Sequence, residues 1–114
     1  MADCLFCKLL AGEIPASIVY EDERVVAFRD INPQAPTHLL VIPRRHIATL
    51  NDLEPEDDGL VGELVRRAAA IAKEQGHAER GYRVVFNCNA DAGQTVFHIH
   101  LHLVGGRKLG WPPG

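Results

Sequence analysis

The segment Val96-Phe97-His98-Ile99-His100-Leu101-His102-Leu103-Val104 alternates histidine with apolar residues and holds three of the six histidines in the chain. A period of two is typical of a β-strand, whose successive side chains point to opposite faces. The pattern therefore predicts one strand with its three imidazoles on one face, neighbouring rings lying about 6.5–7 Å apart. The predicted core face carries Phe97, Ile99, Leu101 and Leu103. A row of histidines beside the small, polar residues 92–95 indicates an anion site, a metal site or both.

The chain has 114 residues, and residues 1–114 are predicted to form a single domain. Its hydrophobic content of 46% and charged content of 24% are ordinary for a globular protein, and its net charge of −3 disfavours a nucleic-acid partner. No apolar run approaches the roughly 20 residues that cross a bilayer, and the N-terminus lacks the pattern of a signal peptide. We therefore expect a cytoplasmic protein with no nucleic-acid or membrane partner.

Local patterns predict five strands and two helices. Strands are expected over residues 17–20, 24–30, 38–43 and 82–87, with the histidine segment as the fifth. A short N-terminal helix is expected over residues 4–11, before Gly12.

A long helix is expected over residues 55–75, with acidic residues at its start and Gly76 after its end. Its apolar stripe consists of Leu60, Val61, Leu64, Val65, Ala68, Ile71 and Ala72. One long helix over mostly sequential strands is an α+β arrangement with a five-stranded antiparallel sheet.

Three further sets of residues have the chemistry of a site. Cys4 and Cys7 form a Cys-x-x-Cys pair, which in a cytosolic chain is typical of metal binding or redox chemistry; two reduced surface thiols are the plainer interpretation. Gly93 and Thr95 have the backbone freedom and the hydroxyl that suit a phosphate, although an ordinary turn has the same residues. Asp30, after the second strand, is either a turn residue or a carboxylate for ribose hydroxyls.

Several motifs in order along the chain carry a resemblance to a known family. They are residues 13–16 (Glu-Ile-Pro-Ala), 28–31 (Phe-Arg-Asp-Ile), 33–38 (Pro-Gln-Ala-Pro-Thr-His), 41–43 (Val-Ile-Pro), 81–85 (Gly-Tyr-Arg-Val-Val), 93–102 (Gly-Gln-Thr-Val-Phe-His-Ile-His-Leu-His), 105–107 (Gly-Gly-Arg) and 111–114 (Trp-Pro-Pro-Gly). With these motifs the sequence resembles the histidine triad (HIT) superfamily and, more narrowly, its nucleotide-binding HINT branch.

The resemblance implies a two-fold homodimer whose sheets join into one continuous ten-stranded sheet, with a purine mononucleotide in each subunit. It implies hydrolysis of purine nucleoside phosphoramidates, such as conjugates of AMP with an amine, through a nucleotidyl-histidine. Hydrolysis of a dinucleoside polyphosphate and a nucleotide-binding interaction module with little turnover are the alternatives.

The resemblance also implies a role for each matching residue. His100 would be the nucleophile, supported by the catalytic histidines His102 and His38. Ile31 would line a purine slot with the apolar residues Phe6, Ile14 and Phe28. Nucleotide contacts would come from Asp30, Ile31, Asn87, Gly93, Gln94, Thr95, His100 and His102; the family more often has serine in place of Thr95.

The cysteine pair departs from the closest HINT pattern. Some bacterial members of the superfamily have such a pair, which holds zinc together with a histidine after the third strand and the first histidine of the triad. The matching residues here are Cys4, Cys7, His46 and His98. The resemblance therefore implies a structural zinc site beside the catalytic one, with no cofactor required for catalysis.

Overall fold

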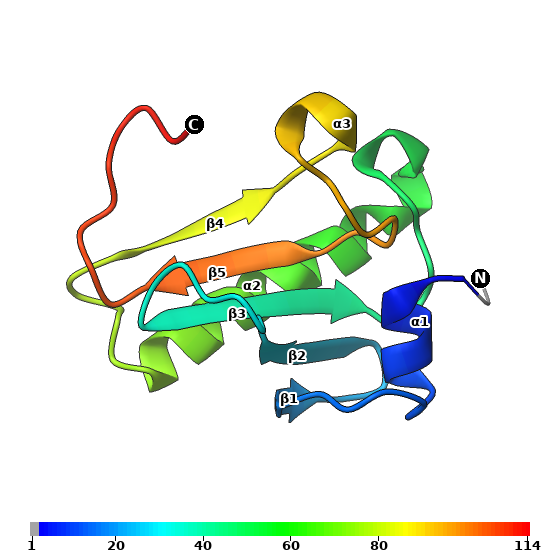
Figure 1. The fold of residues 1–114 in the computed structure, drawn as a ribbon, viewed down its shortest axis with the longest axis horizontal. Coiled ribbons are helices and arrows are strands. Elements are labelled where there is room, and N and C mark those ends of the chain that lie inside the picture. Colours follow the sequence, from blue (N-terminus) through cyan, green and yellow to red (C-terminus); the bar gives the residue numbers. More distant parts are fainter. Residues whose placement is uncertain (1–2) are drawn as a thin grey trace.

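A five-stranded antiparallel sheet forms the centre of the computed structural model, which describes residues 3–114 (Figure 1). The strand order is β1-β2-β3-β5-β4. The strands are β1 (Ile18–Glu21), β2 (Val25–Arg29), β3 (Thr37–Pro43), β4 (Tyr82–Phe86) and β5 (Leu101–Gly105). The first four lie within one residue of their predicted bounds. The predicted α+β class and its five-stranded sheet are confirmed.

Both predicted helices are present, as α1 (Leu5–Leu10) and α2 (Asp58–Glu74). The start predicted for α2 is instead a 3-10 turn, Pro55–Asp57, in which the Asp57 carboxylate accepts the backbone N–H of Glu54. A second 3-10 turn, Leu50–Asp52, and the short helix α3 (Asn89–Ala92) were not predicted. Among residues 3–114, no helix combines the length and apolar character that a membrane span needs.

Helix α2 covers one face of the sheet. Leu60, Leu64, Ala68, Ile71 and Ala72 are buried in one cluster with the side chains of β2, β3 and β5 that point the same way. Val61 is only half-buried, and Val65 is 43% exposed, so including these two in the buried stripe was wrong. Each follows a buried leucine by one residue, and one residue turns an α-helix by about 100°, away from the sheet.

The opposite face of the sheet packs against α1. Phe6 and Leu9 of α1 are buried with Val26, Phe28, Leu40 and Ile42 of β2 and β3. Because side chains alternate along a strand, His38 and His102 lie on this α1 face. His38 pairs with Val104 and Leu40 with His102 in the β3–β5 ladder, so the two histidines are diagonal neighbours.

The prediction of one strand through all three histidines is wrong. Strand β5 begins at Leu101, and residues 94–100 lie outside the ladder. The Ile99 N–H donates to the carbonyl of Ile47 at 2.7 Å, so this segment pairs with the chain that follows β3. Ile99, Leu101 and Leu103 are buried as predicted, whereas Phe97 is 48% exposed and does not belong to the core.

Leu64 is fully buried between α2 and the sheet, whereas Arg66 is exposed on the same helix. Leu64→Ala should lower the free energy of unfolding by about 2–5 kcal/mol, because it removes buried methyl groups and leaves a cavity. Arg66→Ala should change the free energy by less than about 0.5 kcal/mol. Urea unfolding followed by circular dichroism measures both, and equal effects would contradict this packing.

Candidate active site

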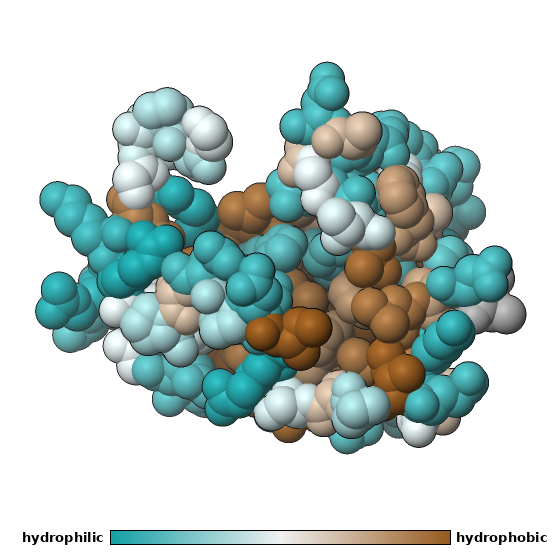
Figure 2. All heavy atoms as spheres, in the orientation of Figure 1, coloured by the Kyte–Doolittle hydropathy of each residue, from teal (hydrophilic) through white to brown (hydrophobic). Residues whose placement is uncertain are grey.

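Small-molecule sites are typically cavities of about 300–1,000 Å³, and one of about 690 Å³ opens on the α1 face beside His100 and His102. Apolar side chains gather in the hollow on this face in Figure 2. The lining comprises Leu5, Phe6, Leu9, Ile14, Pro15, Ala16, Ser17, Phe28, Arg29, Asp30, Ile31, Leu40, Thr95, Val96, His100 and His102. The cavity is thus an apolar slot with a carboxylate and two imidazoles at one end.

His100 has one ring nitrogen fixed by the backbone. Its Nδ1 lies 2.8 Å from the carbonyl oxygen of His98, and because a carbonyl only accepts, Nδ1 carries the proton. Nε2 of the neutral ring therefore holds a free lone pair. Phe6 packs edge-on against the ring, with centroids 5.1 Å apart, and further restricts its orientation. The arrangement prepares Nε2 as a nucleophile.

A chain of hydrogen bonds orients the other two histidines. The backbone N–H of Gln34 donates to His38 Nδ1 at 3.0 Å, so the proton of the neutral His38 ring is on Nε2. His38 Nε2 lies 2.9 Å from His102 Nδ1 and 3.4 Å from a carboxylate oxygen of Asp30. His102 Nδ1 therefore accepts, and the proton of His102 is on Nε2. The result is a lone pair on His100 beside an N–H donor on His102, with ring centroids 5.1 Å apart.

Burial keeps the rings of His100 and His102 neutral. The pKa of His100 lies below its ordinary value, mainly because the ring is buried. Burial, and then the neighbouring His100 and His38, lower the pKa of His102 to about 4. Both imidazoles are therefore uncharged at neutral pH in the absence of a ligand, as a nucleophilic nitrogen needs to be.

The predicted nucleotide-binding residues divide into two groups. Asp30, Ile31 and Thr95 line the cavity, and Ile31 is fully exposed at its mouth. The side chain of Gln94 is buried instead, where it accepts the N–H of Asn89 and donates to the carbonyls of Ala48 and Val96.

Asn87 and Gly93 do not line this cavity either. Asn87 is half-buried just after β4, and Gly93 ends α3 with a φ of 84°, in the left-handed region that favours glycine. Gly93 and Gln94 therefore shape the segment that leads to the histidines.

A second cluster of side chains lies outside the larger cavity. It consists of Cys4, Cys7, His46 and His98. One potential ligand atom from each lies within 4.8 Å of the others. His46 Nδ1 is 3.3 Å from Cys7 Sγ, and His98 Nδ1 is 3.6 and 3.7 Å from the two sulfurs. Zinc bonds of about 2.3 Å to sulfur and 2.0–2.1 Å to nitrogen give tetrahedral edges of about 3.5 Å, so the four atoms fit such an ion.

The tautomer of His98 also fits a metal ligand. Its Nε2 donates to the carbonyl of Pro43 at 2.7 Å, which leaves the lone pair of Nδ1 facing the cysteines. Asp30, His38 and His102 form a second group of close potential ligand atoms. In that group Gln34 holds the proton on His38 Nε2, the nitrogen that would have to bind, so the second group does not suit a metal.

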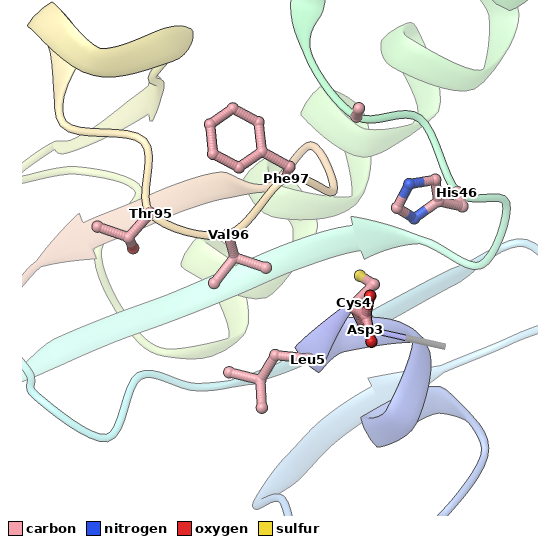
Figure 3. A pocket seen from close by; sticks show the side chains of 8 residues that line it. Asp3, Cys4, Leu5, His46, Thr95, Val96 and Phe97 are labelled. Carbon is pink, nitrogen blue, oxygen red and sulfur yellow. The ribbon is translucent and has the colours of Figure 1, made fainter. Parts of the chain in front are cut away.

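A smaller cavity of about 450 Å³ lies beside the cysteine pair (Figure 3). Its lining includes Cys4 and Leu5 from the start of α1, His46 from the chain after β3, and Val96 and Phe97 from the segment before β5. Thr95 lines both this cavity and the larger one. The first triad histidine thus belongs to the cysteine cluster, while the second and third belong to the larger cavity.

Sequence reasoning missed the backbone groups that orient these side chains. They are the N–H of Gln34 and the carbonyls of Pro43 and His98. It also missed Arg107, whose Nε donates to the Gln34 carbonyl at 3.0 Å. A backbone group has no signature in its residue type, so only Arg107, within the Gly-Gly-Arg motif, offered a signal.

Comparisons with known proteins agree with this geometry. The HIT domain family matches residues 11–109. The chain is 51% identical over 108 residues to the purine nucleoside phosphoramidase of Escherichia coli, covering 95% of this chain and 91% of that protein. It is 57% identical to a HIT family hydrolase from Legionella pneumophila, whose crystal structure it matches with a TM-score of 0.97 over 98% of this chain and 100% of that one.

A histidine triad protein from Clostridium difficile is 45% identical, with a TM-score of 0.93 and 96% of each chain covered. Two histidines that face an apolar cavity on an α+β sheet are the main feature of the site, and these comparisons give the family of the chain. The chain belongs to the HIT domain family and is a hydrolase.

The lowered pKa of His102 makes stability depend on pH. The unfolded residue has a pKa of about 6.5, and the folded one about 4. Between these values the unfolded chain binds a proton that the folded protein does not, so the free energy of unfolding falls as the pH drops from 6.5 to 4. This one group should account for about 3 kcal/mol, at roughly 1.4 kcal/mol per pH unit.

Urea unfolding at pH 7.5, 6 and 5 tests this expectation. His102→Asn should lose less stability than the wild type between pH 6 and pH 5, and the two should run parallel above pH 7. Equal losses in the acidic range would show that His102 is not the group that titrates.

Proposed function

We propose that the protein hydrolyses the P–N bond of purine nucleoside phosphoramidates through a nucleotidyl-histidine intermediate. The observation that supports this best is the pair of oriented imidazoles, a free lone pair on His100 next to an N–H donor on His102. The 51% identity to a phosphoramidase supports the substrate class.

In the first step, the Nε2 lone pair of His100 attacks phosphorus. The P–N bond breaks, its electron pair leaves with the amine nitrogen, and that nitrogen takes up a proton. In the second step, water attacks the phosphorus and releases the nucleoside monophosphate and the His100 ring. The carbonyl of His98 stabilises the positive charge on the ring between the steps, because it accepts the Nδ1 proton.

His102 and His38 serve the same two steps. The negative phosphate of a bound substrate raises the pKa of His102. Its Nε2–H then donates to a phosphate oxygen or, once a second proton from solvent has made the ring an imidazolium, supplies the proton that the amine needs. The water of the second step gives up a proton that replaces it. His38 holds His102 in this tautomer and is itself held by Gln34 and Asp30.

The apolar slot suits the purine and the ribose. Phe6, Ile14 and Phe28 line it, and Ile31 stands at its mouth. The Asp30 carboxylate, which lies between slot and histidines, would accept the ribose hydroxyls. Thr95 lies near the histidines, where its hydroxyl would contact the phosphate.

We further propose that residues 1–114 form one domain. We also propose that this domain pairs with a second copy of the chain along β4. Strand β4 is the last in the sheet order, so one side of it has no partner strand within residues 3–114. Tyr82 and Val84 on this strand are exposed, and so is Val65 of α2. An unpaired apolar edge favours pairing with another chain, which here would give a ten-stranded sheet.

We also propose that Cys4, Cys7, His46 and His98 hold a structural zinc. Two thiolates and two imidazoles would fill all four positions of a tetrahedral zinc ion. The ion would then cross-link α1, the chain after β3 and the segment before β5. Burial lowers the pKa of His98, so its ring is neutral, as a ligand must be.

Replacement of the nucleophile tests the proposed reaction. His100→Ala should reduce turnover of adenosine 5′-phosphoramidate by at least about a thousandfold, because the nucleophilic step is lost. Mass spectrometry of the quenched wild-type reaction should show an adduct of one adenylyl group that the variant lacks, and retained AMP binding shows that the variant is folded. Equal turnover by both proteins would refute the mechanism, and faster wild-type cleavage of a dinucleoside polyphosphate would refute the substrate class.

Elemental analysis with matched cysteine variants tests the zinc site. The purified wild type should contain about one zinc per chain, and Cys4→Ser should lose it together with several kcal/mol of stability. Cys88→Ser should keep the zinc, since Cys88 lies outside the cluster. Absence of zinc from the wild type would overturn the assignment.

A further inference from the structure

A group of positive charges lies away from the catalytic cavity, around the loops before β4 and after β5. A hollow of about 510 Å³ is lined by His77, Arg80, Gly81, Gly106, Arg107 and Lys108. An adjoining hollow of about 290 Å³ shares four of these residues and adds Arg83. No acidic side chain lines either hollow. This grouping runs against the net charge of the chain, which is −3.

These cations have no carboxylate partners within the described part of the chain. The ion pairs between residues 3 and 114 involve Arg24, His38, Arg44 and Arg45, and none involves the cations around the hollows. Like charges held together repel one another, so the cluster costs stability unless an anion neutralises it. A basic hollow without acidic neighbours attracts negatively charged ligands.

Backbone carbonyls hold two of the guanidinium groups in place. Arg107 donates to the carbonyls of Gln34 and Lys108, at 3.0 and 3.1 Å, and Arg83 donates to the carbonyl of Gly110 at 2.8 Å. An arginine has five N–H donors, so both keep donors for a ligand. Gly106, at a φ of 96°, allows this arrangement, because a Cβ there would lie 2.9 Å from Pro36 Cβ.

The hollow is also connected to the catalytic histidines. Arg107 donates a hydrogen bond to the carbonyl of Gln34. The N–H of Gln34 in turn donates to Nδ1 of His38 and so fixes the tautomer of that ring. On the other side, His77 Nε2 lies 2.8 Å from the hydroxyl of Thr37, the neighbour of His38. Two residues of the hollow thus contact the segment that positions His38.

We propose that the basic hollow binds a diphosphate-bearing small molecule and that its occupant is sensed at His38 through Arg107 and Gln34. A diphosphate fits better than a single phosphate, because the cations surround two adjoining hollows. Several charge-assisted hydrogen bonds would hold it, and added salt would weaken it. None of its residues lines the catalytic cavity, so anion binding here can be tested apart from the proposed reaction. The sensing at His38 rests on the proposed function, and the adjoining hollow includes Tyr82, which lies on the β4 edge proposed to pair with a second copy.

Titration of the protein with sodium pyrophosphate tests the site. AMP at saturating concentration first occupies the catalytic cavity, and amide NMR signals are then followed at constant ionic strength. The amides of Gly81, Gly106 and Lys108 should shift and saturate, and the amide of Gln34 should shift with the same Kd. Inorganic phosphate should bind more weakly.

Matched double variants locate the binding. Arg80→Gln with Lys108→Gln should raise the Kd for pyrophosphate at least about tenfold, since each charge-assisted hydrogen bond is worth roughly that factor. Lys8→Gln with Arg66→Gln removes the same charge from exposed residues outside both hollows and should change the Kd less than about twofold.

Several results would overturn the proposal. Equal effects of the two double variants, or shifts confined to the catalytic cavity, would mean that pyrophosphate does not bind here. Equal affinity for inorganic phosphate would refute the diphosphate assignment, and an unshifted Gln34 amide would refute the connection to His38. A changed oligomeric state of the Arg80 and Lys108 variant, measured by light scattering, would assign the cluster to a contact between copies.

Discussion

The active site depends on one hydrogen bond, from His100 Nδ1 to the carbonyl oxygen of His98 at 2.8 Å. It places the proton on Nδ1 and leaves the lone pair of Nε2 free, as the proposed attack on phosphorus requires. The same residue, His98, turns its own ring away, towards Pro43 and the cysteines. A metal bound to that ring would therefore hold in place the carbonyl that orients His100, the proposed nucleophile. The two sites share His98 without sharing a ligand or a substrate.

This arrangement requires the histidine segment to leave the sheet. On a regular strand the three imidazoles would share one face and compete for one site. The segment 94–100 lies outside the ladder, and the Ile99 N–H donates instead to Ile47 in the chain after β3. The ring of His98 therefore enters the cysteine cluster, and of the three triad histidines only His102 lies on the ladder. His102 then meets His38 diagonally across β3 and β5, as the register of the sheet dictates. The chemistry of the three histidines differs because their backbones differ.

Sequence patterns were sufficient for most elements, and the cysteine and histidine motifs named residues that the structure brings together in the cavity and in the cysteine cluster. Helix and strand periods and such motifs are properties of side chains. They were insufficient where hydrogen bonds to backbone groups determine the bounds of a strand or the orientation of a side chain. Alternation of apolar residues cannot distinguish a paired strand from the extended segment before Leu101, whose partner Ile47 lies in a loop. The motif around Gln94 predicts a ligand contact, and nothing in it indicates that the side-chain amide of Gln94 is buried against three backbone groups. The tautomers of His38, His98 and His100 are set by backbone N–H and carbonyl groups, which the residue type does not indicate.

The tautomer of His100 is the central claim, and long-range ¹H–¹⁵N NMR of histidine-labelled protein at pH 7 measures it directly. A protonated Nδ1 and an unprotonated Nε2 on His100, with the proton on Nε2 in His38 and His102, is the predicted result. A His100 ring protonated on Nε2, or on both nitrogens, would contradict the account, because no lone pair would then face the substrate.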